Sequence, residues 1–263
     1  MLEKKSVAVF CDAHFHLVCA AENEDVLSSV KKYGGYVACT CAHSVDEFIT
    51  QEKLLASLKA EAGDIKLFSA FGLHPQEPSL ENADFLERLL QEKRVNAIGE
   101  AGFDFFTAEL KQDVERQEMA WRIQIECAAF YKVPLIIHCR KAIDFIFRDI
   151  SILQKIPALI FHSFSGALLQ AMSILKKGVN AYFSFGKQIL NGNKKAIECV
   201  SKIEEERLLL ETDAPYQTLY GERFTSVGEI ERVYNMAAYL RKVSPCELCV
   251  SLHENFKRVF ELH

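Results

Sequence analysis

The chain has 263 residues, and its 31 Lys and Arg against 36 Asp and Glu give a formal net charge of −5. Broad, sequence-independent binding of nucleic acid depends on clustered basic residues, so this balance excludes a broad cationic surface and leaves only a local site. With 49% hydrophobic and 25% charged residues, the composition is that of a globular protein and not of a disordered or collagen-like chain.

The N-terminus and the cysteines bear on the compartment in which the protein works. The segment MLEKKSVAVFCDAHFH turns polar early and lacks the apolar core of a signal peptide. No apolar run approaches the roughly 18 residues of a membrane span. The nine cysteines form an odd number without a regular framework, which favours reduced thiols. We therefore expect a cytoplasmic protein that does not bind membranes, and the sequence is consistent with a monomer.

Short apolar runs alternate with longer amphipathic stretches along the chain. Runs typical of buried strands occur at Val7–Cys11, Tyr36–Thr40, Lys66–Phe71, Ala97–Glu100, Leu135–His138, Ala158–His162, Ala181–Phe185 and Leu208–Glu211. Helical patterns lie between them at Val45–Glu61, Ala83–Glu92, Ala108–Tyr131, Ala142–Gln154, Leu168–Lys177 and Asn193–Ile203. This alternation predicts a parallel sheet of the α/β class.

The number of strand–helix units decides between two parallel folds. Eight units in a chain of 263 residues predict a closed (β/α)8 TIM barrel, for which about 250 residues is typical. An open doubly wound sheet is disfavoured, because no G-x-G-x-x-G follows the first strand. No linker or change of composition divides the chain, so we expect a single domain over residues 1–263.

Candidate ligands follow the predicted strands, which is where TIM barrels carry their catalytic groups. The first strand runs into Asp12-Ala-His-Phe-His16, and alternate residues of extended backbone point the same way, so His14 and His16 can converge on one metal. Other predicted strands end near His74, Glu100, His138, Arg140, His162 and Asp213. Their joint placement on one barrel face predicts a site, and the other histidines, His43, His253 and His263, are expected on the surface.

The types of ligand indicate the class of reaction. Four imidazoles and two carboxylates exceed the needs of one tetrahedral zinc, but they suffice for two divalent ions about 3.5–4 Å apart that share a carboxylate. Such a pair activates water and stabilises the attacking and leaving oxygens of a phosphodiester. We therefore expect a hydrolase with two divalent metal ions. Sites of this composition accept Zn²⁺, Mn²⁺ or Mg²⁺.

The chain resembles the TatD family of metal-dependent deoxyribonucleases, a branch of the amidohydrolase-like TIM barrels. The resemblance rests on six motifs that occur in order: FCDAHFHL, GLHPQ, AIGEAGFD, VPLIIHCR, FHSFSG and ETDAPY. The resemblance covers nearly the whole chain. It implies one metal held by His14, His16 and Asp213, and a second held by His138 and His162. It also implies that Glu100 bridges the two metals, and that Asp213 and Glu100 are the catalytic residues, with Asp213 shuttling a proton of the attacking water.

The resemblance further implies a DNase supported by Mg²⁺ or Mn²⁺, which cleaves DNA from an end or nicks it at lesions. DNA would then be contacted locally, at the metal site. His74 would contact the substrate phosphate, and Asp12 would orient the histidines. Arg140 has two interpretations that the sequence does not separate, a contact to phosphate or a structural salt bridge.

Two other functions stay open at this point. A hydrolase of the same superfamily would act on a small ester, lactone or amide with the same two metals. A DNA- or protein-binding module that has lost catalysis is disfavoured, because a decayed site would be expected to lack at least one of the six ligands.

Overall fold

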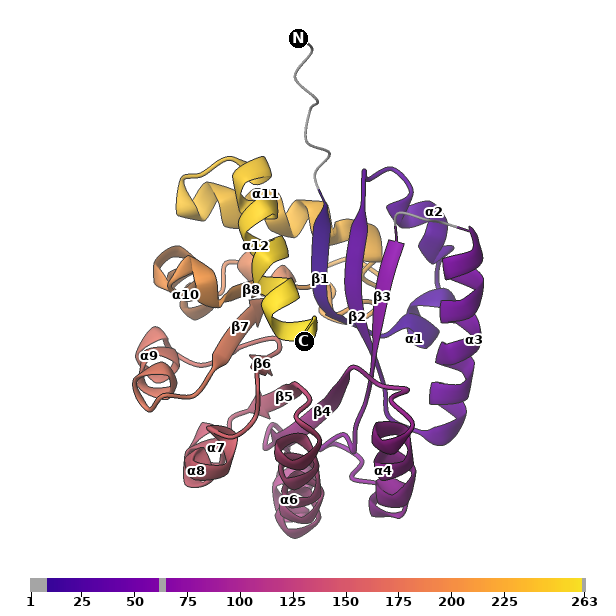
Figure 1. The fold of residues 1–263 in the computed structure, drawn as a ribbon. Coiled ribbons are helices and arrows are strands. Elements are labelled where there is room, and N and C mark those ends of the chain that lie inside the picture. The colour runs from indigo at the N-terminus through magenta and orange to yellow at the C-terminus, as the bar shows by residue number, and fades with distance from the viewer. Residues whose placement is uncertain (1–8, 62–64, 262–263) are drawn as a thin grey trace.

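Eight parallel strands form a ring with helices on its outside in the computed structural model, which describes residues 9–61 and 65–261 (Figure 1). The strands are β1 (Phe10–Phe15), β2 (Tyr36–Ala42), β3 (Ile65–Phe71), β4 (Ala97–Asp104), β5 (Leu135–Arg140), β6 (Leu159–Phe161), β7 (Ala181–Phe185) and β8 (Leu208–Leu210). Each strand pairs with the next in the chain. The predicted (β/α)8 TIM barrel is therefore confirmed.

Hydrogen bonds from the segment after β8 complete the ring. The backbone N–H of Asp213 donates to the carbonyl of His14 at 3.0 Å, and His16 donates to the carbonyl of Ala214 at 2.8 Å. Asp12 adds a side-chain link, because its Oδ1 accepts from the backbone N–H of Thr212 at 2.9 Å. The first and last strands are thus joined at the end where the candidate ligands lie.

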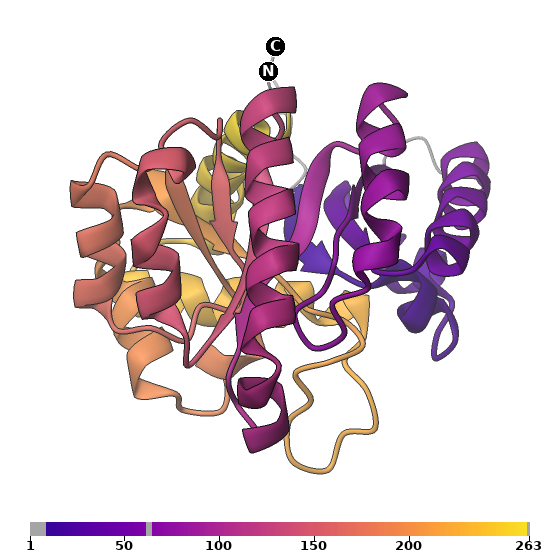
Figure 2. The same ribbon diagram turned by 90° about the horizontal axis from the view of Figure 1, so that it is seen from below.

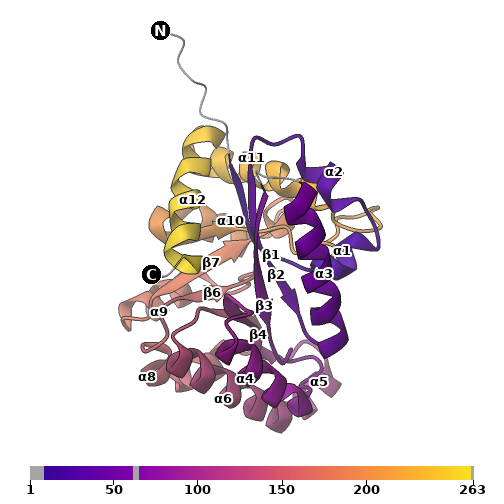
Figure 3. The same cartoon turned by 45° about the vertical axis from the view of Figure 1, so that its right-hand side comes forward.

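The helices form an outer layer, and Figure 3 shows α3 on the outer side of β2 and β3. They are α1 (Leu17–Ala21), α2 (Val26–Val30), α3 (Val45–Glu61), α4 (Ala83–Gln91), α5 (Ala108–Gln112), α6 (Val114–Tyr131), α7 (Ile143–Arg148), α8 (Ile150–Leu153), α9 (Leu168–Lys176), α10 (Lys194–Lys202), α11 (Ile230–Arg241) and α12 (Pro245–Phe260). Among the described residues, no helix is both long and apolar enough to cross a membrane.

The structure differs from the predicted elements in several places. The strand predicted at Val7–Cys11 runs instead from Phe10 to Phe15, and Val7 lies outside the described residues. The helices predicted after the fourth and fifth strands, Ala108–Tyr131 and Ala142–Gln154, are each interrupted, at Asp113 and at Asp149. The sequence patterns do not predict α1 and α2, which have only five residues each, or α11 and α12, which follow the last strand.

Helix α12 covers the end of the barrel at which the strands begin. Its Phe256 and Phe260 pack on Phe68 of β3, with ring centroids 5.5 and 5.6 Å apart, and they join the buried cluster inside the barrel. Lys66, near the start of β3, pairs with Glu261 just after the helix. The loop after β8 projects from the opposite end of the molecule (Figure 2). The carboxyl ends of the strands are therefore left open for a site.

Two strands carry a register shift at that open end. In β1 one extra residue lies between Asp12 and Phe15 relative to β2, and in β4 one lies between Ile98 and Ala101 relative to β5. A bulge of this kind redirects the neighbouring side chains, and bulges are frequent beside active sites. His14 and Glu100 lie within these two irregular stretches.

Candidate metal centre

A polar cavity of about 610 Å³ opens at the carboxyl ends of the strands. Imidazoles and carboxylates line much of it, and the lining includes His16, His43, His74, Glu100, His138, Arg140, His162 and Asp213. His14 lies beneath the cavity and is fully buried. The structure thus brings all the predicted site residues to one place.

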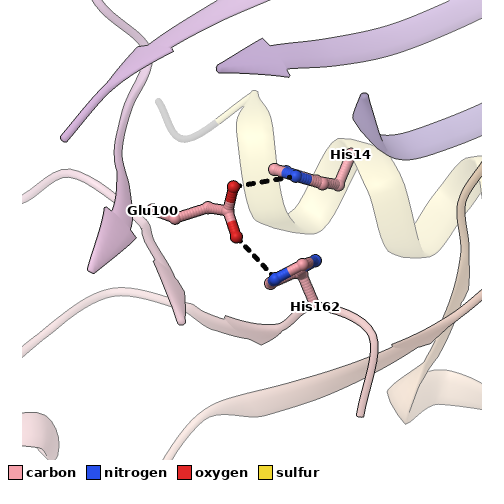
Figure 4. A group of neighbouring side chains, drawn as sticks. All are labelled: His14, Glu100 and His162. Carbon is pink, nitrogen blue, oxygen red and sulfur yellow. Dashed lines mark ion pairs between the residues drawn. The ribbon is translucent and has the colours of Figure 1, made fainter. Parts of the chain in front are cut away.

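Glu100 is buried at the centre of this group, and its two carboxylate oxygens face different histidines. Oε1 lies 3.3 Å from Nε2 of His14 and 3.4 Å from Nε2 of His16. Oε2 lies 2.6 Å from Nε2 of His162 and 3.1 Å from Nδ1 of His138. Figure 4 shows the carboxylate between His14 and His162. A carboxylate in this position can bind one ion through each oxygen.

Further donor atoms converge on each side of Glu100. Nε2 atoms of His14 and His16 are 3.2 Å apart, and Oδ1 of Asp213 lies 3.5 Å from both. On the other side, Nδ1 of His138 is 3.1 Å from Nε2 of His162. Each side therefore offers two imidazoles and a carboxylate oxygen of Glu100, and Asp213 adds a second carboxylate to one of them.

A glycine lets the strands that carry Glu100 and His138 approach each other. Gly102 of β4 pairs with His138 of β5, and its φ of 142° lies where side chains are rarely tolerated. A Cβ at Gly102 would lie 2.0 Å from the carbonyl oxygen of His138. Any larger residue would force the two strands apart and separate the ligands.

Two carboxylates that the sequence analysis left without a role lie against site histidines. Oδ2 of Asp104 is 3.0 Å from Nε2 of His138, and Oε1 of Glu211 is 3.7 Å from Nδ1 of His162. The hydrogen bond between Asp104 and His138 fixes the orientation of that ring and raises its basicity, as carboxylates beside metal-binding histidines do. Glu211 lies too far from Nδ1 of His162 for a hydrogen bond. The signal was available, since Asp104 ends β4 and Glu211 directly follows β8.

Asp12 acts on the backbone and not on the histidine rings. Its Oδ1 accepts from the N–H of His14 at 3.3 Å, and its Oδ2 accepts from the hydroxyls of Tyr36 at 2.9 Å and Thr212 at 2.6 Å. Asp12 is expected to orient the histidines, and in the structure it contacts His14 through the backbone N–H. Asp12 also holds the first strand against the segment that carries Asp213.

Charge within the cluster keeps Glu100 ionised. Burial alone would raise its pKa, but the charge of His162, whose own pKa is raised well above its ordinary value, holds the pKa of Glu100 well below its ordinary value. Burial lowers the pKa of His74 to about 3, despite the opposing charge of Glu100. Burial would also raise the pKa of Asp104, yet hydrogen bonds from His138 and Gln76 bring it to about 2. The carboxylates are thus in the anionic form that binds cations.

His74 and Arg140, the predicted phosphate contacts, lie at the wall and rim of the cavity. Nδ1 of His74 accepts from the backbone N–H of Gln76 at 3.2 Å, while its Nε2 lies 3.6 Å from Oε2 of Glu100. The exposed guanidinium of Arg140 stacks on the ring of Phe106 at 3.4 Å. No described residue forms a salt bridge with Arg140, so the structural salt bridge considered above is wrong.

His43 was expected on the surface, and this expectation is wrong. It follows directly after β2, because that strand continues to Ala42 and not to Thr40 as predicted. Its Nε2 lies 3.3 Å from Oε1 of Glu100. His253 is partly exposed on α12, as expected, and His263 lies outside the described residues.

A parallel barrel with histidines and carboxylates at the carboxyl ends of its strands is the architecture of a metal-dependent hydrolase. The chain belongs to the TatD related DNase family, whose model matches residues 11–261. It is 30% identical over 208 residues to the uncharacterized metal-dependent hydrolase YabD of Bacillus subtilis, covering 75% of this chain and 78% of that protein. It is 32% identical over 204 residues to the 3'-5' ssDNA/RNA exonuclease TatD of Pantoea ananatis, covering 75% of each chain.

Solved structures agree with this assignment. The crystal structure of YJJV, a TatD homologue from Escherichia coli, superposes with a TM-score of 0.80 at 25% identity, covering 97% of this chain and 98% of that one. A TatD family hydrolase from Entamoeba histolytica superposes with a TM-score of 0.82, and at 19% identity it supports the fold alone. The protein is therefore a TatD family metal-dependent hydrolase that acts on ester bonds.

Proposed function

We propose that this protein is a deoxyribonuclease that hydrolyses phosphodiester bonds with two divalent metal ions. The main observation behind the proposal is that the two oxygens of the Glu100 carboxylate face separate pairs of histidines. A single ion would need only one of these pairs, whereas a bridging carboxylate serves both.

The arrangement of the donor atoms supports two ion positions. His14, His16 and Asp213 would hold one ion, His138 and His162 would hold the other, and Glu100 would bridge them. Mg²⁺ or Mn²⁺ are the ions we expect to support activity, and Zn²⁺ also suits the imidazoles. When bound, such a pair supplies a hydroxide near neutral pH and stabilises the charge that develops on the phosphodiester oxygens.

We infer that Asp213 accepts the proton of the attacking water. Its Oδ2 is held by the side-chain amide of Gln217 at 3.0 Å, and its Oδ1 faces His14 and His16. The carboxyl group lies at the cavity wall, and interactions with neighbouring histidines hold its pKa below the ordinary value against the effect of burial. Asp213 is therefore an ionised base beside the position where water would be activated.

His74 is placed to donate a hydrogen bond to a phosphate oxygen. Because its Nδ1 accepts from the N–H of Gln76, the neutral ring carries its proton on Nε2, the atom that faces the cavity. A protonated nitrogen cannot bind a metal, so this tautomer favours a substrate contact for His74 over a ligand role. Arg140 at the rim would neutralise a neighbouring phosphate.

The charge of the protein restricts how DNA is bound. A formal charge of −5 leaves no broad surface attraction, so binding depends on the ions and on a few groups at the cavity. We infer that the protein acts at strand ends or lesions, where a few phosphates can enter. Relatives named as ssDNA/RNA exonucleases support a strand end, and they make RNA the first competing substrate.

One assay tests the proposal. The purified protein is incubated with Mg²⁺ or Mn²⁺ and end-labelled single-stranded DNA, double-stranded DNA or RNA, with and without chelator. We expect DNA cleavage that the chelator abolishes. Cleavage of RNA alone would correct the substrate. Hydrolysis of a small ester, lactone or amide without cleavage of DNA would instead establish the small-molecule hydrolase.

A further inference from the structure

We propose that His43 is an additional metal ligand on the Oε1 side of Glu100, and that it shifts the preference of this side from Mg²⁺ towards Zn²⁺. The inference rests on the proposed metal centre and adds a residue to it. His43 belongs neither to the H-x-H motif nor to the other motifs that carry the family resemblance.

The distances place His43 among the ligands. Its Nε2 lies 3.3 Å from Oε1 of Glu100, the oxygen that also faces Nε2 of His16 at 3.4 Å. Single donor atoms of His16, His43 and Glu100 all lie within 4.8 Å of one another, which is close enough to share one ion. His43 therefore forms, with His16 and Glu100, a second group of donor atoms beside the group of His14, His16 and Asp213, and the two groups share His16.

The ring nitrogens of His43 have no hydrogen-bond partner in the part of the chain that the structure describes, although the ring itself lies beside those of His16 and His74. Its side chain is 21% exposed, but both ring nitrogens are buried and neither has a hydrogen-bond partner among the described residues. The short distance to Glu100 does not have hydrogen-bond geometry. Buried polar atoms normally have a partner, and a cation between His43, His16 and Glu100 would provide one for Nε2.

The start of α3 fixes the backbone from which His43 projects. The N–H of His43 donates to Oε2 of Glu47 at 2.7 Å, and the N–H of Glu47 donates to Oγ of Ser44 at 3.2 Å. These bonds tie the end of β2 to the first turn of the helix. The approach of His43 to Glu100 is thus built into a strand–helix junction.

The chemistry of the donor atoms predicts which metal ion His43 favours. Mg²⁺ prefers oxygen donors in octahedral geometry and retains several waters, whereas imidazole nitrogen suits Zn²⁺ and related ions. With His43, three imidazoles face Oε1 of Glu100. A third nitrogen donor would strengthen binding of Zn²⁺ and contribute little to binding of Mg²⁺.

Metal binding to the full chain tests the inference without any substrate. Apoprotein is prepared by chelation, and the affinities for Zn²⁺ and Mg²⁺ are measured for the wild type, His43→Ala, His43→Asn and the control His253→Ala. Loss of a residue that only hydrogen-bonds to a metal ligand weakens metal binding about tenfold or more. We therefore expect both His43 variants, which lose a ligand, to bind Zn²⁺ at least about tenfold more weakly. Their Mg²⁺ affinity and the behaviour of His253→Ala should match the wild type.

The visible spectrum of bound Co²⁺ provides a second measurement, because it reports changes in the donor set. We expect the spectrum to change in both His43 variants and not in His253→Ala. If His43→Ala does not fold, as judged by circular dichroism, His43→Asn decides the matter. If the His43 variants keep the Zn²⁺ affinity of the wild type and show an unchanged Co²⁺ spectrum, the inference about His43 is wrong, but the proposed metal centre is not affected. A wild-type protein that binds none of these ions would overturn the proposed metal centre as well.

Discussion

Oε2 of Glu100 lies 2.6 Å from Nε2 of His162, while Oε1 of the same carboxylate faces His14 at 3.3 Å. Glu100 thus connects the strand β4 with two distant parts of the barrel, β1 and the segment after β6. Because both oxygens are engaged and the side chain is buried, a change at this position affects both sides of the centre at once.

Replacement of Glu100 by Gln should remove the bridging charge with little change in volume. We expect metal-dependent cleavage of DNA to fall more than about a hundredfold, because loss of a residue that only hydrogen-bonds to a ligand already costs up to about a hundredfold. Circular dichroism should report an intact fold, and the exposed Glu126→Gln on α6 serves as the control. Near-normal turnover of Glu100→Gln would contradict the two-metal proposal.

Asp104→Asn should weaken metal binding through His138. The carboxylate holds Nε2 of that ring at 3.0 Å, and loss of such a partner typically costs about tenfold to a hundredfold in affinity. Glu211→Gln should have a smaller effect through His162, because Glu211 lies 3.7 Å from Nδ1 of that ring. Titration of the apoprotein with Mn²⁺ measures the effect, with the exposed Asp144→Asn as control. Unchanged affinity in both variants would show that these carboxylates serve only the fold.

His74→Ala should impair catalysis without loss of metal. A hydrogen bond to a charged group contributes about 1.5–3 kcal/mol, which corresponds to roughly a tenfold to hundredfold fall in kcat/KM. Steady-state kinetics on single-stranded DNA and the metal content of the purified variant are measured together. A fall in metal content would make His74 a ligand instead.

Arg140→Ala should raise KM for single-stranded DNA and reduce its dependence on salt. One lost phosphate contact lowers the slope of log affinity against log salt by about 0.7. Arg148→Ala is a matched control, because Arg148 also stacks on a phenylalanine, Phe145, at 3.6 Å, but it does not line the metal-site cavity. An equal effect of the two substitutions would indicate a loss of general charge.

Metal removal should lower thermal stability. An ion that binds only the folded state at a hundred times its Kd stabilises that state by about 2.7 kcal/mol. For a chain of this size, that corresponds to about 5–10 °C in Tm. Thermal unfolding of the apoprotein with and without added Mn²⁺ measures the shift, and Glu100→Gln should show a smaller one. No shift in the wild type would mean that the cluster does not bind this ion.

Glu100 and Asp104 show what a local sequence motif predicts about the site and what it does not predict. Both occur in the motif AIGEAGFD, and Glu100 was assigned through the family resemblance, whereas Asp104 was left without a role. The motif specifies which residues a strand carries. It does not specify that Asp104 meets His138, because this contact depends on the register between β4 and β5.

The sequence by itself determined the class of fold and the ligand candidates, because the alternation of apolar runs and the residues at strand ends are local properties of the chain. Only the tertiary structure decided that His43 enters the site and that Arg140 stacks on Phe106 in place of a salt bridge. It also decided that irregular stretches of β1 and β4 carry His14 and Glu100. These features depend on where strands end and on the register between them, which are set by packing around the whole barrel.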